Sequence, residues 1–285
     1  VRDTLRFFNV TEPTYRYTLK NAIADGHLVP YHIYKANTVK TMADGGFDVQ
    51  RSEIDWDALD DDVRAELEQL FDGQDKITVD PKALERKFTI PERNRAIVRE
   101  YRDVMDNGYT GPDGIRRLPQ SGKTIVFAVS KRHAATLAKM FDETFADKKP
   151  SPEVRYADFV VSDLRGEGEG NAEDVIRRFK KEEFPKIIVS VGMLDTGFDC
   201  PEVVNLAFAR FTESSVLYQQ MRGRGTRKAP HIKKTRFTMF DFVGVTDFHG
   251  DDEAYPEGGP VVVSPSKPTR PSKPRLLLTL DIHDE

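Results

Sequence analysis

The chain has 285 residues, of which 38% are hydrophobic and 32% are charged, and its formal net charge is −4 at pH 7. This composition is typical of a globular protein with one large or two modest domains, and the negative net charge argues against binding nucleic acid over the whole surface. No apolar run approaches the roughly 20 residues that span a bilayer, and the start shows no signal-peptide pattern, so we expect a cytoplasmic protein without membrane contact.

Cysteine and histidine usage excludes two kinds of structural cross-link. The lone Cys200 cannot form an intrachain disulfide. The six histidines show no paired spacing with cysteine that would suggest zinc, so no metal site is expected. Cys200 is expected to be a small core residue.

Residues 1–90 are expected to form a smaller α+β connecting segment. A helix is predicted from Tyr17 to Asp25, because Gly26 suits a left-handed C-terminal cap, and a strand is predicted from Val29 to Thr38. Nothing in residues 39–90 carries recognisable chemistry, although part of this stretch is acidic and helical in period.

Strands and helices alternate from residue 91 onward. The expected strands are 124–129, 154–161, 186–191, 203–208 and 237–242. The expected helices are 91–105, 131–146 capped by Ser130, one capped by Asn171, and 214–222. This alternation predicts an α/β domain at about 91–247, with a mostly parallel sheet covered by helices on both faces.

Residues 248–285 change composition, first to acidic residues and then to repeated proline. Proline at this density indicates an extended linker, and we expect it to lead into a further region that the chain lacks.

The tetrapeptide Ser-Gly-Lys-Thr at 121–124 resembles the end of a phosphate-binding P-loop, but two features argue against that function. The first glycine that the pattern requires falls at Arg117. The residues that follow, 125–129, are of β type, whereas a P-loop must open a helix whose amino terminus holds the phosphates.

A pair of arginines, Arg224 and Arg227, stands at the end of the last predicted helix within the pattern Q-x-x-G-R-x-x-R, which starts at Gln220 and includes Gly223. Arginines three residues apart lie on one helical face. Two fork-shaped cations that converge on one point suit a phosphoryl group in transfer. An isolated pair of this kind is more often a solvated helix end.

A second motif, Thr-Gly-Phe-Asp at 196–199, follows the predicted strand 186–191. It is therefore expected at the carboxyl end of that strand, where open α/β sheets place their ligands. Alone, such a Gly-x-Asp loop is merely a turn. Its position one strand and one helix before the arginine pattern makes a shared site the better interpretation.

Together the two motifs resemble the fifth and the last motifs of superfamily 2 helicases and translocases. The block 187–227 and the stretch 7–31 resemble more narrowly the motor (R) subunit of type I restriction enzymes, and the similarity covers most of residues 1–250. The sequence departs from that family at Gly192 and Asp195, where many relatives carry an acidic residue and a threonine.

The resemblance implies that residues 91–247 are a second RecA-like lobe, that 1–90 hold the end of a first lobe, and that 125–129 form the fourth helicase motif. It implies arginine fingers at Arg224 and Arg227. Implied nucleotide contacts are Gly197, Asp199, Gln220 and Gly223. Implied nucleic-acid contacts are Thr196, Ser162, Asp163 and Lys228.

The charged residues of 222–236 are all basic, and two interpretations of this run stay open. Its first half is assigned to the nucleotide, and the second half to a solvated turn or to DNA. The charged residues of the run are Arg222, Arg224, Arg227, Lys228, Lys233, Lys234 and Arg236.

The chain has no Walker A sequence and no D-E-x-H box, which phosphoryl transfer in this superfamily requires. We therefore expect a carboxy-terminal motor fragment, inactive alone, whose ATP and Mg²⁺ site is completed by a first lobe. The resemblance implies a DNA translocase that acts on double-stranded DNA with methyltransferase and specificity subunits, an endonuclease activity being left open. The alternatives are a nucleic-acid-binding module without ATPase activity and a superfamily 2 repair or RNA helicase.

Overall fold

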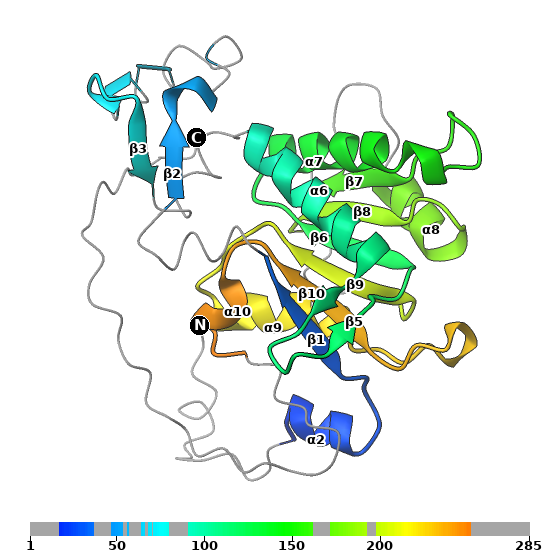
Figure 1. The fold of residues 1–285 in the computed structure, drawn as a ribbon. Coiled ribbons are helices and arrows are strands. Elements are labelled where there is room, and N and C mark those ends of the chain that lie inside the picture. Colours follow the sequence, from blue (N-terminus) through cyan, green and yellow to red (C-terminus); the bar gives the residue numbers. More distant parts are fainter. Residues whose placement is uncertain are drawn as a thin grey trace, which may run out of the picture. The chain divides into compact units, whose positions relative to one another are not determined.

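The computed structural model describes residues 17–36, 47–53, 56, 64–65, 68–69, 71–79, 91–161, 172–192 and 198–251 (Figure 1). Four predicted site residues lie outside the described residues: Ser162, Asp163, Thr196 and Gly197. The proline-rich tail, the predicted cap Asn171 and the stretch 1–16 also lie outside them.

A six-stranded sheet, in which every neighbouring pair of strands is parallel, forms the centre of the fold (Figure 1). The strand order is β1-β10-β9-β6-β8-β7. The strands are β1 (Tyr31–Lys35), β6 (Lys123–Phe127), β7 (Ala157–Val161), β8 (Ile187–Val191), β9 (Val203–Phe208) and β10 (Phe237–Asp241).

Helices cover both faces of the sheet. On one face lie α6 (Pro91–Asn107) and α7 (Lys131–Thr144), where the Tyr101 hydroxyl is 2.8 Å from that of Thr124 on β6. The other face carries α8 (Ala172–Lys181) and α9 (Ser215–Gly223), whose Tyr218 ring lies 5.9 Å from that of Phe208. These findings confirm the predicted α/β class. No helix in the described part of the chain is long and apolar enough to cross a membrane.

Strand β1 joins this sheet although it lies before residue 91. It pairs with β10 in parallel, from Tyr31 opposite Phe237 to Lys35 opposite Asp241. The preceding helix α2 (Leu19–Ala24) ends before Gly26, which has a φ of +68° and so confirms the predicted left-handed cap. The sheet therefore includes a strand from the segment 1–90, which precedes its other five strands in the chain.

The local signals in the sequence explain most helix ends. Ser130 is the N-cap of α7, because its side chain accepts a hydrogen bond from His133 N at 3.2 Å. Gly108 ends α6 with a φ of +74°, and a Cβ atom there would lie 2.4 Å from the Arg117 carbonyl oxygen. Position 108 thus requires glycine both for its backbone angle and for the close approach of a neighbouring strand.

The remaining elements are short. They are β2 (Phe47–Gln50), η1 (Arg51–Glu53), β3 (Lys76–Val79), β4 (Tyr109–Thr110), β5 (Arg116–Arg117), η3 (Ala146–Lys148), η4 (Pro230–Ile232) and α10 (Val245–Phe248). Strands β2 and β3 form an antiparallel hairpin. Near it, the Arg51 guanidinium lies 4.7 Å from the Trp56 ring, and Trp56 packs edge-on against the fully buried Phe71.

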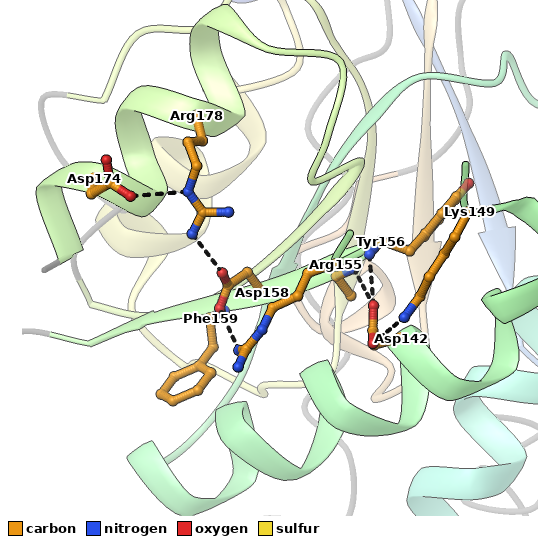
Figure 2. Close-up of polar contacts among 9 residues, drawn as sticks. Asp142, Lys149, Arg155, Tyr156, Asp158, Phe159, Asp174 and Arg178 are labelled. Carbon is orange, nitrogen blue, oxygen red and sulfur yellow. Dashed lines mark hydrogen bonds and ion pairs between the residues drawn. The ribbon is translucent and has the colours of Figure 1, made fainter. Parts of the chain in front are cut away.

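Edge strand β7 carries a buried carboxylate (Figure 2). Asp158 is 5% exposed and accepts hydrogen bonds from Arg178 on α8 at 3.0 Å and from Phe159 N at 2.9 Å. Nearby, Asp142 of α7 accepts from Tyr156 N at 2.6 Å. Charged side chains therefore tie both covering helices to the start of β7, and an inward-pointing charge makes an edge strand a poor template for pairing with another chain.

Replacement of Asp158 by alanine should lower the free energy of unfolding by about 2–3 kcal/mol, because it removes a buried charge-assisted partner of Arg178. The matched control is Asp174→Ala, which deletes the other carboxylate on Arg178. Asp174 is 45% exposed, so water screens its ion pair and its loss should lower the free energy of unfolding much less than the loss of Asp158. Urea unfolding of both variants measures the difference. Equal losses would contradict the structural role assigned to Asp158.

Candidate functional site

The two predicted fingers do not lie on one helical face. Helix α9 ends at Gly223, and Arg224 is its C-cap, with its backbone N–H donating to Met221 O at 3.1 Å. The next residue, Gly225, donates to Arg222 O at 3.1 Å, so the chain tightens into turns beyond the helix. The helical-face argument was wrong, because the helix stops one residue before the first arginine.

Both arginines nevertheless reach the second motif. The Arg224 guanidinium donates through Nη1 to the Phe198 carbonyl oxygen. The guanidinium of Arg227 lies 3.6 Å from the Asp199 carboxylate, and these two side chains are 55% and 52% exposed. The exposed pair contributes little to stability. The pair matters for position, because it brings a residue of one motif next to a residue of the other.

This meeting point lies between the carboxy-terminal ends of α8 and α9. The Phe198 ring lies 6.1 Å from that of Phe179 on α8, with Lys180 Nζ 4.7 Å from its centre. Since β9 runs parallel to β8, residues 198–202 must return toward the opposite edge of the sheet. The expected position at the carboxyl edge is therefore wrong for Phe198 and Asp199.

Three other predicted contacts, Gln220, Gly223 and Lys228, lie in or after helix α9. Gln220 and Gly223 are half-buried on the last turns of α9. Lys228 is exposed, and its Nζ would lie 3.9 Å from a Cβ atom on Gly26. Lys228 therefore lies beside the end of α2, whereas Arg227 lies beside Asp199.

A glycine between the motif's arginines permits the close packing of this segment. A Cβ atom on Gly225 would lie 2.3 Å from a ring carbon of Phe237, the first residue of β10. Gly225 is buried, and the Phe237 ring has no room to give way because it is itself 1% exposed. The backbone next to Arg224 therefore packs directly against the first residue of β10.

Comparison with known proteins gives this geometry its context. Residues 113–229 match the family described as the helicase conserved C-terminal domain. The EcoKI endonuclease subunit, a type I restriction enzyme component of Escherichia coli, is 34% identical over 262 residues, which is 89% of this chain and 20% of that subunit. The EcoAI endonuclease subunit, also from Escherichia coli, is 23% identical and is matched by 85% of the chain over 26% of its own length.

A solved fragment described as the HsdR subunit of a type I restriction enzyme from Vibrio vulnificus shares the fold. It aligns with 90% of this chain and 40% of its own, with a TM-score of 0.60 and 23% identity. The chain belongs to the superfamily 2 helicases, as part of a type I restriction enzyme R subunit. It spans only 20% and 26% of the lengths of the two R-subunit relatives named above.

The basic run of this R-subunit segment is not a continuous phosphate-facing surface. Arg222 is half-buried and forms an ion pair of 2.5 Å with the buried Asp251. Lys234 is 5% exposed and donates to the Val203 and Pro201 carbonyl oxygens at 2.5 and 3.0 Å. The assignment of Arg222 to the nucleotide and of Lys234 to solvent or DNA was therefore wrong, and no local sequence signal marks their buried partners.

The lysine of the P-loop-like tetrapeptide is also structural, which confirms the rejection of that motif. Lys123 opens strand β6, not a helix, and its Nζ donates to the Glu182, Glu183 and Pro185 carbonyl oxygens at 2.6, 3.0 and 2.9 Å. Burial lowers the pKa of both Lys123 and Lys234 to about 8.

Lys234 should contribute a rise in the free energy of unfolding between about pH 8 and 10.5, because in this window the unfolded chain binds more protons at Lys234 than the folded chain does. Lys234→Met should remove this contribution. Denaturant unfolding at several pH values measures it. The control is Lys233→Met, because the neighbouring Lys233 is exposed, and it should leave the slope as in the wild type. An unchanged slope in Lys234→Met would contradict the predicted titration.

Proposed function

We propose that this chain is the second motor lobe of an ATP-dependent translocase on double-stranded DNA, within the R subunit of a type I restriction-modification system. The observation that carries the proposal is the contact of Arg224 and Arg227 with Phe198 and Asp199. Two motifs that lie about 25 residues apart in the sequence meet there, and one of them supplies two cationic groups.

The chemistry of these side chains fits the phosphate end of a nucleotide. Guanidinium groups are planar and permanently charged, and they bind phosphate oxygens in a fork. ATP, when bound, supplies the γ-phosphoryl group that is transferred to water. Arg224 and Arg227 would stabilise the charge on that group as arginine fingers, and Gln220 and Gly223 would line the same side of the cleft.

The first lobe, which this chain lacks, would hold the triphosphate and Mg²⁺. Among the described residues no group of three or more His, Cys, Asp or Glu side chains is placed to hold a metal ion. We assign the magnesium ligands and the phosphate cradle to that first lobe, because residues 1–285 contain no Walker A sequence and no D-E-x-H box. It follows that the fragment alone should be inactive.

The hydrogen bond from Arg224 to Phe198 suggests how nucleotide binding is coupled to movement. Phe198 is the third residue of the Thr-Gly-Phe-Asp motif, so a shift of Arg224 toward a phosphate would pull on the backbone between Gly197 and Asp199. Thr196, in the same motif, would pass this shift to DNA. Ser162, Asp163 and Lys228 remain the other proposed nucleic-acid contacts.

Arg224→Ala in the full-length protein should reduce DNA-stimulated ATP hydrolysis by about 10³-fold or more, because an arginine finger contributes roughly 10³ to 10⁵ in rate. DNA binding should stay close to that of the wild type. Turnover and DNA affinity are measured at one salt concentration, because phosphate contacts depend strongly on salt.

The matched control for this experiment is Arg236→Ala, which removes an exposed arginine from the same basic run. It should hydrolyse ATP at the wild-type rate. Normal turnover in Arg224→Ala would refute the finger assignment. The absence of a Walker A sequence upstream in the reading frame would instead favour a nucleic-acid-binding module without ATPase activity.

The proposed pathway has its own test. Affinity purification of the full-length protein from its native cells should recover a methyltransferase and a specificity subunit in stable association. Mass spectrometry of the purified complex identifies them. Isolation of the protein without either subunit, but with DNA-stimulated ATPase activity, would favour a repair or RNA helicase instead.

A further inference from the structure

A buried carboxylate connects the arginine-bearing segment to the first strand of the chain. Asp251 accepts hydrogen bonds from the Tyr31 hydroxyl, the Tyr218 hydroxyl and the Arg222 guanidinium, each at 2.5 Å. Tyr31 belongs to β1, whereas Tyr218 and Arg222 belong to α9. These four residues are called the Asp251 cluster below.

The cluster is enclosed and charged. The side chains of Arg222 and Asp251 are 17% and 8% exposed, and Tyr31 and Tyr218 are almost fully buried. Burial and the Asp251 carboxylate raise the pKa of Tyr218, so its hydroxyl stays a donor. Burial alone would lower the pKa of Arg222, but Asp251 outweighs this effect and the pKa is raised. Arg222 is thus a charged structural residue directly before the two fingers.

A second connection joins the same two parts of the chain. The backbone N–H of Val29 donates to the Thr226 carbonyl oxygen at 2.9 Å, and Thr226 is 4% exposed. The carbonyl oxygen of Pro30 accepts from Phe237 N at 3.1 Å. Residues 29–31 therefore hold the segment 222–226 at both of its ends, by a backbone bond near Arg227 and by the Asp251 cluster before Arg224.

The position of β1 in the chain suggests a function for these contacts. It is an edge strand of the sheet, at the opposite side from β7, and it is the first strand of the chain among the described residues. The proposed function places the first lobe on the amino-terminal side of this strand. A displacement of the first lobe would therefore reach residues 29–31 along the backbone, and from there the arginine segment through short, buried hydrogen bonds.

We propose that residues 29–31 act as a strut that positions Arg224 and Arg227, with Tyr31, Asp251 and Arg222 as positioning residues. The inference rests on the proposed function, since it assigns a role to the support of the same arginines. A rigid support matters because an arginine finger acts only from a defined geometry, and a shift of about 1 Å can cost up to roughly 100-fold in rate.

The alternative is that the Asp251 cluster only stabilises the fold. The two roles differ in what they predict for the removal of one hydroxyl. A stabilising role lowers the midpoint of thermal unfolding without changing turnover in the folded enzyme. A positioning role lowers kcat while KM for ATP stays constant, because an interaction of the transition state is weakened and substrate binding is not.

The test compares Tyr31→Phe with Tyr34→Phe in the full-length protein. Tyr34 lies on the same strand and also donates its hydroxyl to a carboxylate, that of Glu100 at 2.6 Å, but it faces α6. We expect Tyr31→Phe to lower kcat of DNA-stimulated ATP hydrolysis about tenfold. KM for ATP and DNA affinity should be unchanged, and Tyr34→Phe should keep the wild-type kcat.

A second variant and the finger variant complete the test. Tyr218→Phe removes another donor from Asp251 and should also lower kcat, so it replaces Tyr31→Phe if that protein fails to fold. Wild-type kcat in the folded cluster variants, or equal losses in Tyr34→Phe, would overturn the strut. If Arg224→Ala has lost turnover in the same assay, the proposed function survives that result. Normal turnover in Arg224→Ala overturns both.

Discussion

The parallel direction of all six strands is the constraint on which the rest of the structure depends. Parallel neighbours cannot be joined by tight hairpins, so each connection must cross a face of the sheet and return to its starting edge. Phe198 packs beside Phe179 of α8, and α9 covers the same face of the sheet. Phe198 and Asp199 are thereby brought to Arg224 and Arg227.

Because these connections lack regular partners at their ends, charged side chains complete the hydrogen bonding of the backbone. Lys123 takes the carbonyl groups at 182, 183 and 185, and Lys234 takes those at 201 and 203. Conversely, the negatively charged Asp241 carboxylate accepts hydrogen bonds from the backbone N–H groups of residues 243, 245 and 246. Each buried charge is offset by several dipoles, which reduces the cost of its removal from water.

The extent to which the sequence predicts this protein follows the range of the interactions involved. Strand β9 has the bounds that the sequence predicts. Ser130 begins a helix and Gly26 ends one, as their local chemistry requires. The β-type residues after Lys123 were sufficient to reject it as a phosphate ligand, and Lys123 indeed opens a strand. Arg222 and Lys234 could not be assigned, because their partners are separated from them by 29 to 33 residues and no periodicity connects them.

By itself the sequence determined the alternation of strands and helices, since this depends on periodicity and turn residues. It also gave the two motifs that carry the proposed site, and their resemblance to known motifs indicated the family. Only the tertiary structure decided which basic residues face that site and which hold the fold together. It also brought the Tyr31 hydroxyl within hydrogen-bond distance of Arg222, which lies 191 residues later in the chain. The physical reason is that the role of a charged side chain is set by the groups around it and by its burial, and both arise only when distant segments pack.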